Sequence, residues 1–191
     1  MKSKKIRCRW ASDSINQMYH DREWGKPVHQ DQKLFEFLIL EGAQAGLSWT
    51  TILKKRENYR QAFVDFDVLK VSKFNSQKIR GFMKNEGLVR NRLKLQSAVG
   101  NAQAFLKLQK EFGSFDKYIW QFVQGKPILS RRRNRQVWPT ASPEAERMSR
   151  DLKARGFRFV GPTICYAFMQ ACGLVNDHSI ECFRHPRPVR K

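Results

Sequence analysis

Four residues near the two ends of the chain have side chains that could bind one metal ion together: Cys8, His20, His178 and Cys182. The last two are four positions apart, which places both side chains on one face of a helical turn. Two sulfurs and two imidazole nitrogens form a tetrahedral zinc site, structural because no position is left for water. Two separate thiols and two surface imidazoles remain the alternative, since the spacing of Cys8 and His20 matches no common zinc finger.

A carboxylate interrupts an otherwise apolar helix face. The spacing places Glu41 on the same face as Leu34, Leu38 and Ala45. Burying a carboxylate costs free energy unless it is paired. A buried ion pair with one of the many Arg or Lys residues is one explanation. The other is a pocket acid that hydrogen-bonds a ligand, and periodicity alone favours the ion pair.

Aromatic residues lie close in sequence to these candidates. Trp10 lies two positions after Cys8, and Tyr19 immediately precedes His20. Trp49 begins a predicted helix eight positions after the carboxylate. Aromatic rings stack on nucleic-acid bases, but rings at helical spacing are more often part of a core. These aromatics are therefore candidates for binding a flat ligand, with core packing as the alternative.

The charge balance indicates a polyanionic partner. The 191 residues include 37 Lys and Arg against 17 Asp and Glu, a formal net charge of +20. Such an excess favours nucleic-acid binding, because each neutralised phosphate releases counterions. A basic RNA-binding or ribosomal protein shares this signature, and an acidic membrane surface is a weaker competitor. No apolar run approaches the roughly 20 residues that span a bilayer, so no membrane partner is expected.

The N-terminus and the cysteine content indicate a reducing compartment. The basic residues at 1–7 are followed by CRWASD, which does not have the apolar stretch of a signal peptide. The four Cys residues are therefore not expected to form disulfides, and we expect a cytoplasmic protein. Cys165 and Cys172 lie in an apolar segment and are expected to be small core residues.

The elements that position these residues are expected to be helices, because apolar residues recur every three or four positions. We predict a single all-α domain over 1–191, which could fall into two helical lobes joined by a basic connector at about 125–144. Ser48 should cap the helix that begins at Trp49, whose outer face would carry Lys54, Lys55 and Arg56. The predicted helices run from 31 to the break at 46–47, 49–63, 76–85, 92–112, 115–123, 143–155 and 162–171. The loop at 130–140 contains four Arg residues and is either a solvated mobile connector or a phosphate-contacting segment.

A tight hairpin is predicted near residue 160. Gly156 ends one helix, and Gly161 with Pro162 begins the next. Free backbone N–H groups at that helix start can bind a DNA phosphate, with Gly161 and Thr163 as candidate contacts. This is the pattern of a helix-hairpin-helix motif, although Phe-Val-Gly at 159–161 replaces its usual Gly-x-Gly. A plain pair of helices without a DNA role is the alternative.

Several stretches of this sequence closely resemble the bacterial DNA-3-methyladenine glycosylase I family. The similarity extends from about Cys8 to Cys182 and weakens across 125–144. The stretches are MYHDREWG at 18–25, LEGAQAGLSW at 40–49, KKRENYR at 54–60 and GPTICYAFMQACGLVNDH at 161–178. The resemblance implies the all-helical fold of the helix-hairpin-helix glycosylase superfamily. It also implies a monomer that releases 3-methyladenine from alkylated double-stranded DNA by hydrolysing the N-glycosidic bond.

The resemblance also implies roles for individual residues. Glu41 matches the acid that hydrogen-bonds the extruded base, and Trp49 matches the residue that stacks on it. Tyr19 and Trp10 would line the pocket. Gly46 and Leu47 match the region that fills the gap left by the flipped nucleotide, and Gly161 and Thr163 fall in the DNA-binding hairpin. The family's ligands for one structural Zn²⁺ match Cys8, His20, His178 and Cys182.

Two positions bear on how far the resemblance extends. Asn176 stands where many helix-hairpin-helix glycosylases have a catalytic Asp, which agrees with this family because it works without that Asp. Asn16 stands where an aromatic is expected three positions before Tyr19, so one wall of the pocket could be altered. We expect a monofunctional enzyme in which an ionised Glu41 accepts hydrogen bonds from the base. The alternatives are a non-catalytic DNA-binding protein of the same fold and a glycosylase with another lesion preference.

Overall fold

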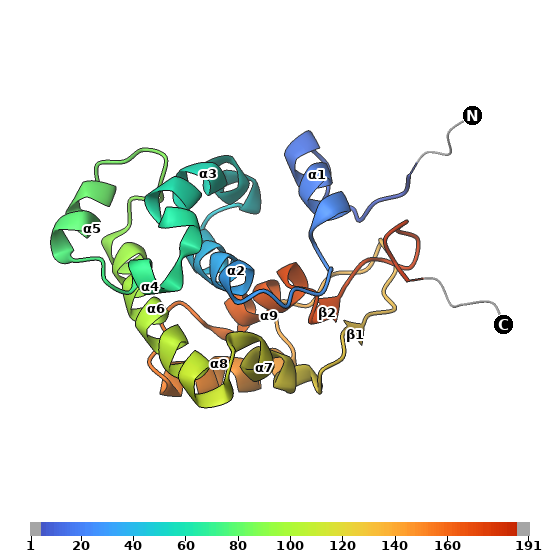
Figure 1. The fold of residues 1–191 in the computed structure, drawn as a ribbon. Helices are drawn as coiled ribbons and strands as arrows, with labels where there is room; N and C mark the ends of the chain where they lie inside the picture. The colour runs from blue at the N-terminus through green and yellow to red at the C-terminus, as the bar shows by residue number, and fades with distance from the viewer. Residues whose placement is uncertain (1–4, 187–191) are drawn as a thin grey trace.

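The computed structural model describes residues 5–186, which are mostly helical as predicted (Figure 1). Its strands β1 (Ile128–Leu129) and β2 (Val175–Asn176) form a short parallel pair that the sequence did not predict. Two 3₁₀ turns, η1 (Val64–Phe66) and η2 (Gln121–Val123), follow α3 and α7. The helices are α1 (Ser14–Arg22), α2 (Asp31–Gln44), α3 (Trp49–Ala62), α4 (Val68–Val71), α5 (Ser76–Phe82), α6 (Arg92–Phe112), α7 (Phe115–Trp120), α8 (Pro143–Ala154) and α9 (Pro162–Ala171).

Side-chain caps fix where most of these helices begin. In each, an oxygen of the residue before the helix accepts a hydrogen bond from an N–H of the first turn, which would otherwise have no partner. Ser48 caps α3 in this way by accepting from the N–H of Thr51, as predicted. The other caps are Asp13, Asp67, Asn75, Asn91, Ser114 and Ser142.

Helix α2 lies at the centre of the fold and is buried on every side. All ten residues from Leu34 to Ala43 are buried, whereas the periodicity predicted burial of one face. A helix that is apolar all round must be covered by other helices on each side. The ring of Phe35 on α2 packs against Phe105 at a centroid distance of 5.3 Å, and Phe105 stacks on Phe115 at 4.0 Å. The same central helix carries Glu41.

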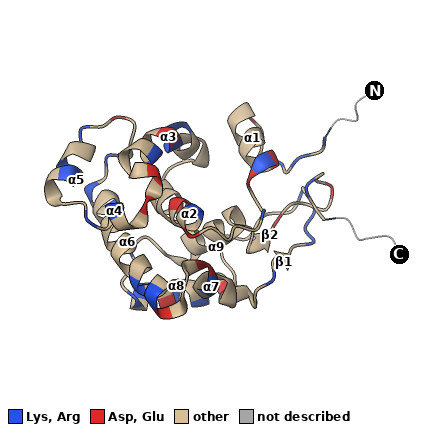
Figure 2. Cartoon of the chain, viewed as in Figure 1, with Lys and Arg blue, Asp and Glu red and all other residues tan. Residues whose placement is uncertain are grey.

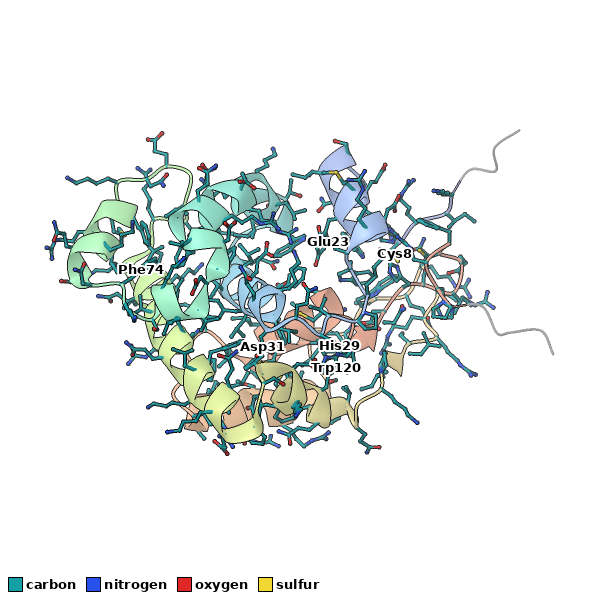
Figure 3. All side chains as sticks on the ribbon, viewed as in Figure 1. Cys8, Glu23, His29, Asp31, Phe74 and Trp120 are labelled. Carbon is teal, nitrogen blue, oxygen red and sulfur yellow. The ribbon has the colours of Figure 1, made fainter. Side chains whose placement is uncertain are left out.

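Arg56 faces inward, so its predicted place on the outer basic face of α3 is wrong. Its side chain is 13% exposed. The guanidinium donates two hydrogen bonds to Glu23, at 2.8 and 2.7 Å, and one to Glu36 at 2.8 Å. Burial raises the pKa of Glu36, but the charge of Arg56 and its hydrogen bonds outweigh burial and lower that pKa. Arg56 therefore joins α3 to α2 and to the residue after α1, and Glu23 lies between α1 and α3 in Figure 3. Lys54 is exposed, as predicted.

The segments that lead to the two ends of the chain lie side by side (Figure 1). The backbone N–H of Phe183 donates to the carbonyl of Ile6 at 3.0 Å. The loop at 130–140 lies against both, since the N–H of Ile180 donates to the carbonyl of Arg132 at 2.9 Å. Figure 3 shows Cys8 where these segments meet. The first and last described parts of the chain therefore form one unit of structure.

Lys and Arg occur on most of the helices and on the segments near the two ends (Figure 2). Within residues 5–186, no helix has the length and apolar character needed to cross a membrane.

Candidate active site and metal centre

A cavity of about 330 Å³ opens beside Glu41. That volume is at the small end of the range for ligand pockets. Four predicted site residues lie together in its wall: Trp10, Tyr19, Glu41 and Trp49. The remaining lining residues were not predicted from the sequence and are Trp24, Gln44, Trp138, Pro139, Thr140, Ala167 and Gln170.

Glu41 is a buried acid without a counter-ion. The residue is 5% exposed, and its carboxyl group has no hydrogen bond or ion pair with any residue in the described part of the chain. The buried ion pair favoured by periodicity is therefore absent there. Because burial penalises the charged form, the pKa of Glu41 is raised to about 8. By itself, burial thus favours the protonated form of this carboxyl at neutral pH.

Aromatic rings form much of the cavity wall. The ring centroid of Tyr19 lies 5.2 Å from that of Trp49 and 6.1 Å from that of Trp10. Trp10 in turn packs edge-on against Trp24, at 4.9 Å. Burial, together with the nearby Glu41 carboxyl, raises the pKa of Tyr19, so its hydroxyl keeps its proton. The cavity therefore combines aromatic faces with one acid, a combination suited to a flat and cationic ligand.

Two amide side chains in the wall could have been identified from helical spacing. Gln44 lies three positions after Glu41 and therefore on the same side of α2. Gln170 lies on α9, three positions after the lining residue Ala167. The Gln170 amide donates to the Asp177 carboxylate at 2.7 Å, which leaves its carbonyl oxygen free to accept a hydrogen bond from a ligand.

Asn16 lies outside the cavity wall. It is buried, and its amide donates to the Asp13 carboxylate at 2.6 Å and to the Thr50 hydroxyl at 2.7 Å. These hydrogen bonds join the start of α1 to the start of α3. In this chain the position holds two helices together and adds nothing to the pocket surface.

The turn between α2 and α3 lies between two lining residues, Gln44 and Trp49. Gly46 has a φ of +77°, a left-handed conformation that glycine adopts without strain. Leu47, the next residue, is 42% exposed. The ammonium group of Lys94 donates to the carbonyls of Ala43 and Ala45, which are among the last carbonyls of α2 and would otherwise be unpaired. The turn thus holds an apolar side chain out at the edge of the cavity.

The predicted hairpin is present between α8 and α9. Phe159, which replaces the first glycine of the expected turn, has a φ of 55°, a left-handed conformation that is costly for a bulky residue. It is held there against α2, where a side chain at Gly42 would come within 3.3 Å of the Phe159 Cβ. Within residues 5–186, no side chain caps α9 at Gly161, which leaves N–H groups of its first turn without a partner there. Thr163, in that first turn, is exposed.

The four predicted metal ligands form one buried cluster. The ligand atoms of Cys8, His20, His178 and Cys182 all lie within 4.8 Å of one another. The Cys182 sulfur lies 3.4 Å from Nε2 of His20 and 3.5 Å from Nδ1 of His178. The Cys8 sulfur lies 3.6 Å from Nδ1 of His178. Such a group could hold a metal ion.

Neighbouring groups orient both imidazoles of the cluster. Nδ1 of His20 donates to the Asp21 carboxylate at 2.9 Å, which leaves Nε2 facing the cluster. Nε2 of His178 donates to the carbonyl of Trp24 at 3.0 Å, which leaves Nδ1 facing the cluster. Each ring is therefore fixed in the tautomer that a metal ligand requires.

The two thiols of the cluster affect each other's protonation. The hydrogen bond from the Cys8 thiol lowers the pKa of Cys182, which favours Cys182 as the thiolate of the pair. The same hydrogen bond and burial raise the pKa of Cys8. A cation placed among these groups would stabilise both thiolates, because metal ligation requires deprotonated sulfur.

Comparison with known proteins gives one consistent family. The family model described as methyladenine glycosylase matches residues 10–185. DNA-3-methyladenine glycosylase 1 of Escherichia coli is 45% identical over 181 residues, which cover 94% of this chain and 97% of that protein. DNA-3-methyladenine glycosylase of Haemophilus influenzae is 49% identical over 177 residues, 92% of this chain and 96% of that protein.

Solved structures agree with that family. A crystal structure of 3-methyladenine DNA glycosylase I superposes with a TM-score of 0.92 at 46% identity, covering 95% of this chain and all of that one. A Staphylococcus aureus structure described as the basis of 3-methyladenine recognition has a TM-score of 0.91 at 38% identity. It covers 95% of this chain and 97% of that one. By both sequence and structure, therefore, the chain belongs to the methyladenine glycosylase family.

Proposed function

We propose that this chain is a DNA-3-methyladenine glycosylase, which hydrolyses the N-glycosidic bond and releases 3-methyladenine from alkylated DNA. The observation that carries the proposal is the unpaired, buried Glu41 in the wall of an aromatic cavity. The names of the relatives at 45% and 49% identity support the same activity.

The chemistry of the lesion explains why such a cavity would suffice. Alkylation at N3 gives the adenine in DNA a positive charge, which weakens its bond to the sugar. Water adds to the C1′ carbon as the C1′–N9 bond breaks, so that neutral 3-methyladenine leaves and the water loses a proton. The enzyme therefore needs to select, orient and enclose the base. No lysine lines the cavity within residues 5–186, which fits attack by water and a monofunctional enzyme.

Glu41 and the aromatic rings would select the base by its charge. The face of an aromatic ring attracts a cation, and Trp49, Tyr19 and Trp10 present such faces to the cavity. A cationic base also lowers the pKa of the buried Glu41, so that the carboxyl ionises as the lesion binds. The ionised carboxylate then accepts hydrogen bonds from donors on the base, and a base that lacks those donors leaves it unpaired.

A base in a duplex must leave the helix to reach this cavity. We propose that the lesion flips out, at a cost that is lower for a damaged base than for an intact one. In this proposal Leu47, which is exposed beside the left-handed Gly46, would fill the space left in the stack. A net charge of +20 favours double-stranded DNA as the partner.

The start of α9 would hold a phosphate of the same DNA. Its first-turn N–H groups are free, and the helix dipole adds positive potential at this end. Gly161 lies directly before this helix, and the exposed Thr163 lies in its first turn. We assign the α8–α9 hairpin to the helix-hairpin-helix class on this basis.

We propose that the Cys–His cluster binds one zinc ion. Bond lengths of about 2.3 Å to sulfur and 2.0–2.1 Å to nitrogen, at tetrahedral angles, place sulfur and nitrogen ligands about 3.5 Å apart. The observed sulfur–nitrogen distances are 3.4, 3.5 and 3.6 Å. With four protein ligands the ion would be structural and would have no position for water.

The remaining expectations concern the state of the protein in the cell. We propose one domain, because the buried apolar residues of α2 and the surrounding helices form a single cluster. We also propose that this domain acts as a monomer. A reducing, cytoplasmic setting is supported by four cysteines that are buried and free of disulfides.

The proposal is tested by identifying the bases released from methylated DNA by chromatography. Wild-type protein is expected to release 3-methyladenine, and Glu41→Gln to do so about 100-fold more slowly, because it cannot become a carboxylate. Glu86→Gln is the matched control, since that side chain is 88% exposed and should leave the rate unchanged. If wild-type protein binds methylated DNA and releases no base, it is a non-catalytic DNA-binding protein. If Glu41→Gln matches wild type, Glu41 has no part in the mechanism.

A further inference from the structure

We infer that Trp138 is a base-contacting residue of the cavity, and that the loop at 130–140 is held in place by residues adjacent to the Cys–His cluster. This inference rests on the proposed function, because it assigns a further wall to the same site. The sequence alone is compatible with two roles for this loop, a solvated connector and a phosphate-contacting segment.

Trp138 turns inward from an exposed segment. Its neighbour Val137 is 89% exposed, whereas Trp138 is half-buried and lines the cavity with Pro139 and Thr140. The indole N–H donates to the backbone carbonyl of Asp177 at 3.0 Å. Because that hydrogen bond uses the only polar atom of the ring, Trp138 offers the cavity its aromatic carbon surface.

Trp138 comes from a different part of the chain than the other aromatic walls. The other aromatic residues that line the cavity within residues 5–186 all precede residue 50. Trp138 instead joins Ala167 and Gln170 in the part of the wall that comes from the C-terminal half. A base in this cavity therefore contacts aromatic surface from both halves of the chain, and stacking on a ring stabilises any base, whatever its sequence.

One residue of the loop fastens it to the N-terminal segment. The carbonyl oxygen of the Asn134 side chain accepts from the N–H of Arg9 at 2.7 Å. Its amide donates to the carbonyl of Arg7 at 2.9 Å. Arg7 and Arg9 are the two neighbours of Cys8 in the sequence. The Asn134 side chain therefore forms hydrogen bonds to the backbone on both sides of one cluster ligand.

The same loop is fastened to the C-terminal segment. The backbone N–H of Asn134 donates to the Glu181 carboxylate at 3.0 Å, and the N–H of Ile180 donates to the carbonyl of Arg132. Glu181 directly precedes Cys182, and Asp177, which accepts from Trp138, directly precedes His178. Residues next to three of the four ligands thus hold the loop, and the position of Trp138 depends on how the ends of the chain are joined.

Binding of free 3-methyladenine, measured by calorimetry, tests the contact without involving DNA. Trp138→Ala is expected to weaken binding about tenfold, the scale of one lost aromatic–base stack. Trp138→Phe keeps an aromatic face and should stay within about threefold of wild type. Trp138→Leu keeps apolar volume but has no aromatic face, so its affinity for the free base should fall as much as that of Trp138→Ala. The Leu variant also provides the test if the Ala variant does not fold. Val137→Ala is the matched control and should bind as wild type does.

The outcomes separate this inference from the proposed function. Suppose that wild-type protein releases 3-methyladenine and that the Ala and Leu variants of Trp138 bind the free base as tightly as wild type does. Trp138 is then no base contact, and the proposed function stands. If wild-type protein neither binds nor releases 3-methyladenine, the proposed function fails and this inference fails with it.

A double-mutant cycle tests the support by Asn134. Asn134→Ala should weaken binding of the free base in wild-type protein and have no further effect in Trp138→Ala, because both changes remove the same contact. Arg135→Ala, an exposed change in the same loop, is the control and should leave binding unchanged. If Asn134 had a purely structural role, Asn134→Ala would lower the melting temperature without changing the affinity for the free base. Additive effects of the two substitutions on binding would overturn the coupling.

Discussion

At the scale of single residues, Glu41 decides the character of the site. The sequence identified this acid as unusual because it lies on an apolar face, but left an ion pair and a pocket acid open. Arg56, which is the kind of partner that an ion pair would need, is occupied by Glu23 and Glu36. Glu41 therefore has no ion pair to offset its burial, and its pKa is raised to about 8. Such a group stabilises its protonated form and is poised to ionise when a cation enters.

The raised pKa of Glu41 predicts a pH-dependent free energy of unfolding. The carboxyl holds its proton up to about pH 8 in the folded chain and only to about pH 4.5 when unfolded. The contribution of Glu41 to the free energy of unfolding is therefore greatest below pH 4.5. It falls as the pH rises from 4.5 to 8 and is constant above pH 8. Glu41→Gln has no carboxyl to titrate and so avoids this loss. Between pH 5 and pH 8, its free energy of unfolding should rise relative to that of wild type by on the order of a few kcal/mol.

Urea unfolding of both proteins at several pH values measures that difference. The Glu86→Gln variant is the control, because an exposed carboxyl should leave the wild-type pH profile unchanged. If Glu41→Gln and wild type show parallel profiles from pH 5 to pH 8, Glu41 is not a raised-pKa acid in the folded protein.

At the scale of elements, local signals predicted most of the helices but missed α1 and α4, and they failed where tertiary contacts decide. Ser48 and Gly156 lie at helix ends as predicted, because caps and left-handed turns depend on a few neighbouring residues. The β1–β2 pair could not be found, since two residues from each of two distant segments carry no periodic pattern. Trp138 was missed for a similar reason: what turns it inward is a hydrogen bond to Asp177, far along the chain.

The inward-facing Arg56 gives a prediction for the junction of α2 and α3. Arg56→Met should lower the free energy of unfolding by about 2 kcal/mol, because it leaves the buried Glu36 with weaker partners. The loss should be smaller than for a fully isolated charge, since Lys33 and Arg60 still contact Glu36. Lys54→Met, an exposed change on the same helix, is the control and should stay within about 0.5 kcal/mol of wild type. Equal stability of the two variants, measured by urea unfolding, would contradict the role of Arg56.

At the scale of the whole molecule, the Cys–His cluster joins the two ends of the chain. Spacing alone could not pair the ligands, because Cys8 and His178 are 170 positions apart. The family resemblance implied the set, and the fold brings the four ligand atoms within 4.8 Å of one another. The base pocket was predicted in a similar way: the resemblance supplied Trp10, Tyr19, Glu41 and Trp49. The walls from the C-terminal half depend on contacts that no single stretch of sequence encodes.

The cluster predicts the metal content and its effect on stability. Purified protein should contain about one zinc ion per chain by elemental analysis, and Cys182→Ala should lose the metal and melt at a lower temperature. Cys165→Ala is the matched control: it removes another buried thiol outside the cluster and should keep the metal. Native protein purified without metal, or a Cys182→Ala variant that keeps its full metal content, would contradict the proposed zinc site.

The meeting of the two ends also sets the order in which this protein can be completed during synthesis. Cys8 is synthesised long before its cluster partners His178 and Cys182, since His178 lies 170 positions later in the chain. Contacts of such long sequence separation form late, because the whole intervening chain must first be ordered. A nascent chain can therefore fold its central helices during translation before the segment that carries His178 and Cys182 is available to join Cys8. Premature termination between Gln170 and Asp177 would then remove two of the four cluster ligands and the hydrogen-bond acceptor of Trp138 while leaving the helices in place.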